Sequence, residues 1–177
     1  MQELPITNKK DPWPKGWGQK TSIMGVINLT PDSFSDGGEL NSSKKVLDQV
    51  NDFLRNGVDV IDLGAQSTRP GAEEICSSLE IKRLIPYLKL IKIEYPDVLI
   101  SIDTFNSDVA YEALLNGANW INDVTGGRRD EKILEVVSKF NCPFVLTHSR
   151  GNSQNMNELS HYKNILSDVK DLSLIHI

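Results

Sequence analysis

Short apolar segments alternate with amphipathic segments along this sequence, and no other feature constrains the fold as strongly. Five segments are rich in valine and isoleucine and largely apolar on both faces: residues 22–28, 58–63, 98–103, 119–123 and 142–148. This pattern is typical of parallel strands that helices cover. The segments between them carry apolar residues at helical spacing: residues 42–57, 77–96, 107–117 and 131–140. The repeated strand–helix unit predicts a parallel α/β fold.

A polar residue ends each predicted strand, and this decides between the two kinds of parallel α/β fold. These residues are Asn28, Asp62, Asp103, Asn122 with Asp123, and His148. In a (β/α)₈ TIM barrel the carboxyl ends of all strands meet on one face, whereas an open sheet concentrates such residues near one switch point. Polar ends on five successive strands favour the barrel. Since such a barrel needs roughly 250 residues, we expect this chain of 177 residues to carry about the first five strand–helix units, with residues 161–172 beginning the fifth helix.

The segment of residues 77–96 contains two local signals. Ser77 lies three residues before Glu80, which is the spacing of a capping box at the start of a helix. Pro86 lies inside the same segment and is expected to kink or divide the helix, because proline lacks the backbone N–H.

Composition and charge narrow the classes of function. A net charge of −5 without any basic run argues against a nucleic-acid or membrane surface. No apolar run approaches the roughly 18 residues of a membrane helix, and residues 1–20 lack the apolar stretch of a secretory signal, so we expect a cytoplasmic protein. Cys76 and Cys142 form neither a CxxC pair nor a disulfide framework, and we expect both to be reduced packing residues.

The segment after the first predicted strand is poor in packing residues. Residues 29–38 contain one proline, two aspartates, two serines and two glycines, a composition that suits a mobile lid over a site at the strand ends. Asn28 offers an oxygen to a hard cation such as Mg²⁺, or an amide N–H to a phosphate. The alternative is that Asn28 bonds its own backbone in a turn.

The loop after the second predicted strand has a similar composition. Gly64 and Gly71 give the backbone freedom. Ser67 and Thr68 supply hydroxyl groups and Arg69 a cation, a combination that suits an oxyanion. An ordinary surface turn with a solvated arginine is the alternative.

Two strand-end residues are candidates for binding a heterocycle. Asp103 follows the largely apolar segment of residues 99–102, and its carboxylate can accept paired hydrogen bonds from an amidine-like edge; the alternative is an N-cap. Asn122 can offer both a donor and an acceptor to a ring; the alternative is a buried amide that the backbone satisfies. We expect Asp62 and Asp123 to brace neighbouring loops. His148 has no nearby Cys or carboxylate pattern, which favours a satisfied core histidine over a zinc ligand.

Four segments carry a resemblance to a known family. They are MGVINLTPDSFSDGG (residues 24–38), IDLGAQSTRPGA (61–72), SIDTFNSDVAYEALLNGANWINDVTGG (101–127) and THSRGNSQNM (147–156). In order and spacing they resemble the N-terminal part of dihydropteroate synthase, over roughly residues 22–157. The folate-dependent methyltransferases, which share the pterin-binding barrel, are the alternative family.

The resemblance implies a (β/α)₈ barrel and a transferase of folate biosynthesis. The enzyme joins 6-hydroxymethyl-7,8-dihydropterin diphosphate to 4-aminobenzoate and releases pyrophosphate, with Mg²⁺ as cofactor. By resemblance, Asn28 binds the metal and the diphosphate, Thr68 contacts the diphosphate-bearing substrate, and Asp103 with Asn122 holds the pterin ring. The two loops close over the aminobenzoate, which points to Phe34, Asp36, Arg69 and Pro70. Asn28, Thr68 and Arg69 are therefore the candidate catalytic residues.

The chain also departs from the family pattern. Many members have Gly-Gly-Glu-Ser where this chain has residues 64–67 with Gln66, and many have methionine at Thr147. The later motifs of the family, which supply a pterin Asp, a Lys, an Arg and a His, do not occur in the sequence. We therefore expect residues 21–177 to form an incomplete pterin-binding domain that is inactive by itself. We expect residues 1–20 to form an N-terminal extension. The whole enzyme is expected to be a homodimer; a non-catalytic pterin-binding module is the alternative.

Overall fold

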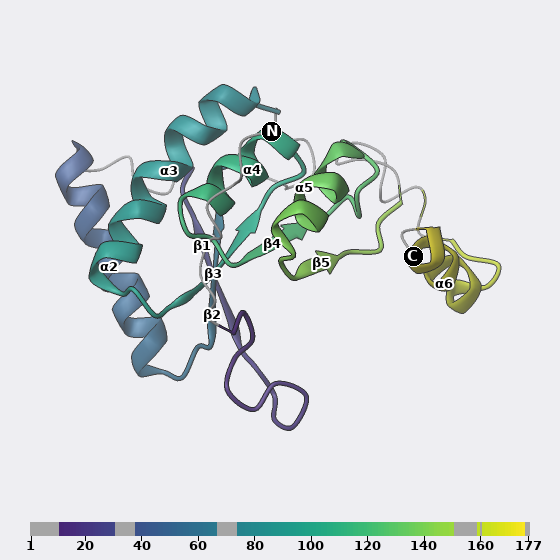
Figure 1. The fold of residues 1–177 in the computed structure, drawn as a ribbon, viewed down its shortest axis with the longest axis horizontal. Coiled ribbons are helices and arrows are strands. Elements are labelled where there is room, and N and C mark those ends of the chain that lie inside the picture. The colour runs from purple at the N-terminus through teal and green to yellow at the C-terminus, as the bar shows by residue number, and fades with distance from the viewer. Residues whose placement is uncertain (1–10, 31–37, 67–73, 151–158, 160, 176–177) are drawn as a thin grey trace.

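The computed structural model describes residues 11–30, 38–66, 74–150, 159 and 161–175. Parallel strands alternate with helices, as the sequence predicts (Figure 1). In chain order the elements are β1 (Met24–Asn28), α2 (Gly38–Arg55), β2 (Val60–Gly64), α3 (Ser77–Glu94), β3 (Leu99–Asp103), α4 (Ser107–Leu115), β4 (Trp120–Asp123), α5 (Lys132–Phe140), β5 (Phe144–Leu146) and α6 (Ile165–Ile175).

The order of the strands is that of a barrel. All neighbouring strands are parallel and follow the chain as β1-β2-β3-β4-β5. A doubly wound sheet instead reverses its order at a switch point. The sequence-based preference for the barrel over the open sheet is confirmed, and the described chain carries five successive barrel strands.

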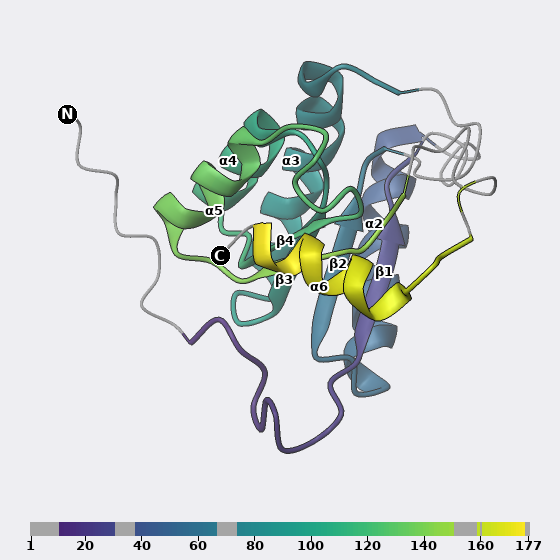
Figure 2. The same ribbon diagram turned by 90° about the vertical axis from the view of Figure 1, so that its right-hand side faces the viewer.

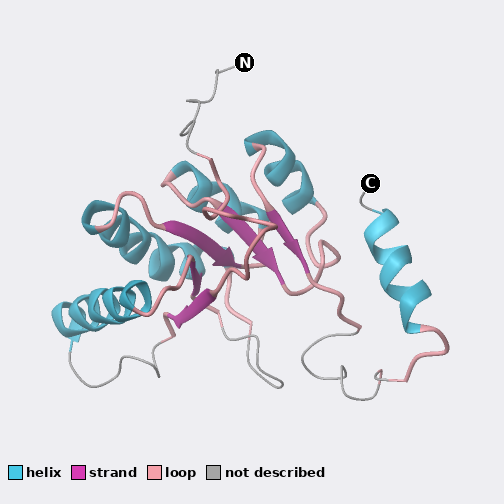
Figure 3. Cartoon of the chain, turned by 90° about the horizontal axis from the view of Figure 1, so that it is seen from below, coloured by secondary structure: helices cyan, strands magenta, loops and turns pink. Residues whose placement is uncertain are grey.

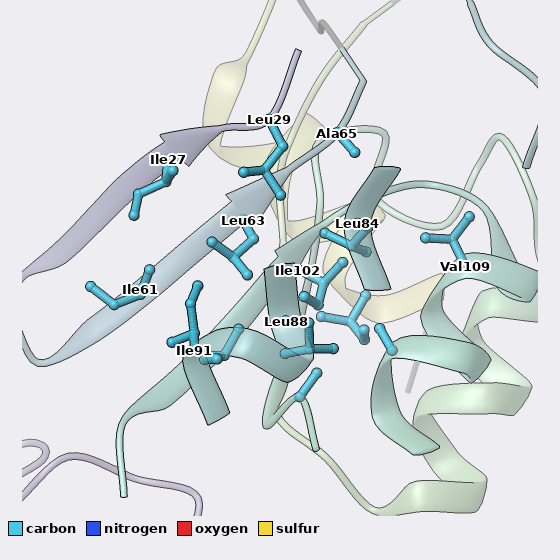
Figure 4. Packing of buried hydrophobic residues seen from close by; sticks show 14 of the residues in the cluster. Ile27, Leu29, Ile61, Leu63, Ala65, Leu84, Leu88, Ile91, Ile102 and Val109 are labelled. Carbon is cyan, nitrogen blue, oxygen red and sulfur yellow. The ribbon is translucent and has the colours of Figure 1, made fainter. Parts of the chain in front are cut away.

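The core lies between one face of the sheet and helices α2 to α5. Strand residues of this face, including Ile27, Leu63 and Ile102, are completely buried. They pack toward Leu84 and Leu88 of α3 (Figure 4). Burying one such side chain stabilises the fold by about 1.5–3 kcal/mol, so the alternating branched residues hold each strand against the helix layer.

The opposite face of the strands mixes polar and apolar residues, so the expectation that both faces are largely apolar holds fully only for the face that the helices cover. We call it the lumen face, because in a closed barrel it faces the interior. By strand alternation it carries Met24, Val26, Asn28, Val60, Asp62, Gly64, Leu99, Ser101, Asp103, Trp120, Asn122 and Val145. Val26 is 50% exposed, whereas the adjacent Ile27 is fully buried. Helices therefore cover only one face of the described sheet.

Residues 11–20 pack against the amino ends of the strands. Trp13 and Trp17 contact the ring of Trp120, with centroids 5.3 and 5.4 Å away. Trp120 Nε1 donates to the carbonyl oxygen of Pro12 at 2.6 Å. Figure 2 shows this purple segment below the sheet, at the amino ends of β1 and β2. The boundary drawn between residues 20 and 21 stays a prediction, but the described part of the extension contacts the sheet.

The capping box expected for α3 is wrong, and of the two effects expected of Pro86, a kink or a division, the division does not occur. The N-cap residue is Cys76, and no side chain caps this end of the helix. Glu80 is 1% exposed and accepts a hydrogen bond from Asn106 Nδ2 at 2.6 Å, so its carboxylate serves a distant loop and forms no capping box. Pro86 does not divide the helix. Because Pro86 and Lys82 are exposed, the carbonyl that the proline leaves unpaired can bond to water.

Helix α6 lies apart from the other helices (Figures 1 and 3). It confirms the helix expected after the fifth strand. Three of its apolar side chains are exposed, namely Ile165, Leu166 and Val169. Across the described ranges, no helix combines the length and the apolar character that crossing a membrane requires.

Candidate active site

Four residues at the carboxyl ends of adjacent strands form one row on the lumen face. Asn28 is in register with Gly64, Gly64 with Asp103, and Asp103 with Asn122. Residues in register on neighbouring parallel strands point to the same side of a sheet. The structure thus brings together Asn28, Asp103 and Asn122, as expected from their positions after apolar strand residues. We call Asn28, Gly64, Asp103 and Asn122 the mouth row.

The mouth row corrects the position expected for Asp62. The sequence predicts that Asp62 marks the polar end of the second strand, but β2 continues to Gly64. Asp62 therefore lies one layer deeper in the lumen, in register with Ser101 of β3. It is 2% exposed. The expectation that Asp62 braces a loop is wrong.

Gly64 has no side chain, and the position that a side chain would occupy lies beside Asp103 and Asn28 of the mouth row. A Cβ atom at this position would lie 3.4 Å from Asp103 Oδ2 and 3.8 Å from Asn28 Oδ1. Both oxygens therefore border the volume that a side chain on residue 64 would begin to fill. This volume is available to a ligand that both residues contact.

Asp103 carries an unsatisfied carboxylate. Its Oδ1 atom is buried and has no hydrogen-bond partner among the described residues. The N-cap of α4 is Asn106, so the alternative that Asp103 caps this helix is wrong. Burial, together with the carboxylates of Asp62, Glu80 and Asp123, raises the pKa of Asp103 to about 7. A ligand that donates hydrogen bonds to Asp103 would supply the missing partners.

Asn122 is held by a carboxylate from two strands away. Its Nδ2 atom donates to Asp62 Oδ2 at 3.2 Å, so a side chain rather than the backbone satisfies this amide group. Burial raises the pKa of Asp62, while the hydrogen bond from Asn122 acts in the opposite direction.

The other two strand-end residues serve the structure around the row. Asp123 accepts hydrogen bonds from the Thr125 N–H at 2.7 Å and the Gly127 N–H at 2.8 Å, which confirms that it braces the β4–α5 loop. His148 lies two residues beyond β5, and its Nε2 is 3.1 Å from the Tyr162 hydroxyl. Its Nδ1 has no partner in the described part of the chain, so the expected satisfied histidine is only half satisfied.

Two contacts near the mouth involve residues that the sequence does not predict as site residues. Arg129, in the β4–α5 loop, pairs with Glu74 just before α3 and lies over the Phe105 ring at 5.8 Å. Arg128 donates to Ser149 Oγ at 2.9 Å. Both arginines follow two glycines, which is the one local signal of a loop that presents cations.

Several predicted site residues lie outside the described residues. They are Phe34, Asp36, Thr68, Arg69 and Pro70. Their roles, and the lid expected after the first strand, stay predictions.

The oxygen atoms at the mouth suit a hard cation that takes most of its ligands from water and substrate. No group of three or more His, Cys, Asp or Glu side chains in the described ranges is arranged to hold a metal ion. Asn28 is exposed at the mouth and its Oδ1 borders the space at Gly64. Mg²⁺ commonly combines one or two protein oxygens with water and substrate phosphates. Asn28 fits that mode of binding.

Comparison with known proteins identifies the family. The family model described as "Pterin binding enzyme" matches residues 24–174. The chain belongs to the pterin-binding enzyme family. It is 42% identical to dihydropteroate synthase from Synechocystis over 154 residues, covering 87% of this chain and 53% of the relative. It is 48% identical to a folate synthesis bifunctional protein of Arabidopsis thaliana over 157 residues, covering 86% of this chain and 32% of the relative.

Solved structures of the pterin-binding family have the same fold. A dihydropteroate synthase from Clostridium difficile, determined with pteroic acid, matches with a TM-score of 0.81 and 39% identity, over 90% of this chain and 58% of the other. The Yersinia pestis dihydropteroate synthase matches with a TM-score of 0.77 and 34% identity, over 88% and 56%. The resemblance to dihydropteroate synthase is thus confirmed. The chain spans about half the length of its bacterial relative from Synechocystis.

Proposed function

We propose that the protein containing this chain is a dihydropteroate synthase. It condenses 6-hydroxymethyl-7,8-dihydropterin diphosphate with 4-aminobenzoate to give 7,8-dihydropteroate and pyrophosphate. The mouth row carries the proposal, because it places Asp103 beside Asn122 at the carboxyl ends of barrel strands, and the Asp103 Oδ1 atom has no partner in the part of the chain that the structure describes. Supporting this, dihydropteroate synthases of similar fold were determined with pteroic acid and with 4-aminobenzoic acid.

The mouth row binds the pterin through its hydrogen-bond acceptors. The ring carries N–H groups, and the buried Oδ1 atom of Asp103 has no hydrogen-bond donor among the described residues. Pairing the two removes the cost of the unsatisfied group in the free protein. Gly64 keeps the space beside Asp103 open, so the ring can approach the strand backbone.

The reaction replaces a C–O bond with a C–N bond. The amine nitrogen of 4-aminobenzoate attacks the methylene carbon of the pterin, pyrophosphate leaves with the C–O electron pair, and the nitrogen loses a proton to solvent. Asn28 would hold Mg²⁺ next to the diphosphate oxygens. When bound, this ion supplies positive charge where the leaving group becomes more negative.

The loops after β1 and β2 complete the proposed site. Thr68 would contact the diphosphate arm, and Arg69 would stabilise the departing negative charge. Phe34, Asp36 and Pro70 would enclose the aminobenzoate and exclude water, which competes as a nucleophile. A homodimer and a cytoplasmic location stay predictions.

Pyrophosphate release by the protein expressed from its complete gene tests the proposal. We expect release only when both substrates and Mg²⁺ are present. Asn28→Ala should lower the rate at least about tenfold at limiting Mg²⁺, as expected for loss of a ligand group. Asn56→Ala is the matched control, because Asn56 is exposed beyond α2 and its side chain donates to the Asp52 carbonyl, within its own helix end.

Other outcomes would favour the alternatives. Methyl transfer from methyltetrahydrofolate, without pyrophosphate release, would identify a pterin-binding methyltransferase. Binding of pteroic acid with neither activity would identify a non-catalytic pterin-binding module. Equal loss of rate in Asn28→Ala and Asn56→Ala would contradict the role given to Asn28.

A further inference from the structure

A hydrogen bond crosses the lumen face from β2 to β4. Asp62 Oδ2 accepts it from Asn122 Nδ2 at 3.2 Å. Strand β3 lies between the two partners, and the residue in register with Asp62 on β3 is Ser101. Ser101 is small and fully buried, so it leaves room for the bond to pass over the central strand.

The chemistry of Asp62 fixes which side of the Asn122 amide faces it. An ionised carboxylate only accepts hydrogen bonds, so it pairs with the N–H₂ group of an amide and repels the carbonyl oxygen. Asp62 is 2% exposed, so its carboxylate has little access to water as a substitute partner. The Asn122 carbonyl oxygen must then point away from Asp62.

We propose that Asp62 is a positioning residue that makes Asn122 present its carbonyl oxygen, and not its N–H₂ group, to the ligand. Asn122 is in register with Asp103, which presents a carboxylate. The two residues together then form an all-acceptor edge, which selects heterocycles with a donor edge and rejects those with a carbonyl at the same place. This inference rests on the proposed pterin site and assigns the origin of its selectivity.

Comparing the affinities of two ligands that differ in one exocyclic group would measure this selectivity. Pterin-6-carboxylate carries an exocyclic amino group where lumazine-6-carboxylate carries a carbonyl oxygen. We would measure both dissociation constants at pH 8, to favour ionised carboxylates, with the protein expressed from its complete gene. The wild type is expected to prefer the pterin by at least about tenfold, since an acceptor facing acceptors loses a charge-assisted hydrogen bond.

Variants at residue 62 separate positioning from charge. Asp62→Leu removes the acceptor, which allows the Asn122 amide to turn, and should reduce the preference for the pterin to about threefold or less. Asp62→Asn replaces the acceptor-only carboxylate with an amide that can accept or donate, and should reduce the preference less than Asp62→Leu does. Glu80→Gln is the control for charge alone, because Glu80 also acts electrostatically on Asp103 but bonds to Asn106. It should retain the preference.

The outcomes distinguish this inference from the proposed function. A wild-type preference that survives in Asp62→Leu, or that falls equally in Asp62→Asn, overturns the positioning role and leaves the pterin site intact. Failure of the wild type to bind either ligand overturns both. If Asp62→Leu does not fold, Asp62→Ser replaces it, because the serine hydroxyl is too short to reach Asn122 and should give the same loss of preference.

Discussion

The raised pKa of Asp103 leads to a prediction about the free energy of unfolding that can be tested without a ligand. Its pKa is raised to about 7 from an ordinary value of 3.8, chiefly by burial. Between these two pH values the folded protein holds a proton on Asp103 that the unfolded chain has lost. The free energy of unfolding should therefore decrease as the pH rises through this range. Asp103→Asn removes the titration while keeping the shape of the side chain.

The size of the effect follows from the pKa difference. A difference of about 3 pKa units at about 1.4 kcal/mol per unit gives an upper limit of about 4 kcal/mol. The expected value is smaller, because Asp62 and Glu80 also have raised pKa values. Protons bound to these neighbours relieve part of the repulsion. We expect Asp103→Asn to gain about 1–4 kcal/mol relative to the wild type between pH 4 and pH 8.

Urea unfolding at several pH values between 4 and 8 would measure this difference for the protein expressed from its complete gene. Asp59→Asn is the control of opposite sign, since the hydrogen bond from the Ile23 N–H at 2.9 Å lowers the pKa of Asp59. That variant should lose stability by an amount that stays constant between pH 4 and pH 8, because the lowered pKa of Asp59 lies below this range. A constant difference between Asp103→Asn and the wild type at every pH would refute the reasoning.

Three further substitutions test separate parts of the fold. Gly64→Ala should leave the free energy of unfolding within about 1 kcal/mol, because the new Cβ meets nothing closer than 3.4 Å, but should weaken pteroic acid binding measured by calorimetry. Gly25→Ala should cost about 1–3 kcal/mol in urea unfolding, because its Cβ would lie 2.5 Å from the nearest atom of the Phe53 ring; an unchanged midpoint would contradict this packing. Trp120→Phe, which loses the donor to the Pro12 carbonyl, should cost about 1 kcal/mol and speed proteolysis within residues 11–20; unchanged cleavage would show that the segment does not depend on this bond.

The sequence was sufficient to predict the strands and most of the mouth row. Runs of branched residues such as those around Ile100 are buried on the helix side, and the polar residue after each run marks the carboxyl end. The sequence alone does not place Gly64 in the row, because Asp62 is the last polar residue of the predicted second strand, whereas β2 ends at Gly64. Counting alternate positions back from Gly64 would have placed Asp62 on the lumen face.

Contacts between residues far apart in the chain cannot be predicted from local sequence patterns. Glu80 reaches Asn106, which is 26 residues away, and no local pattern distinguishes this from the capping box that its spacing to Ser77 suggests. The bond between Asp62 and Asn122 spans 60 residues. Both depend on which strands become neighbours, and tertiary structure decides that.

The spacing of parallel strands determines the length of the ligand that the whole mouth row can contact. Neighbouring strands lie about 4.8 Å apart, so the three intervals from Asn28 to Asn122 add up to about 14 Å. A bicyclic heterocycle is shorter than this and reaches only part of the row. If Asp103 and Asn122 hold the ring, Asn28 contacts a different part of the same ligand. The distance between the strands then determines how long the arm between the ring and the diphosphate must be.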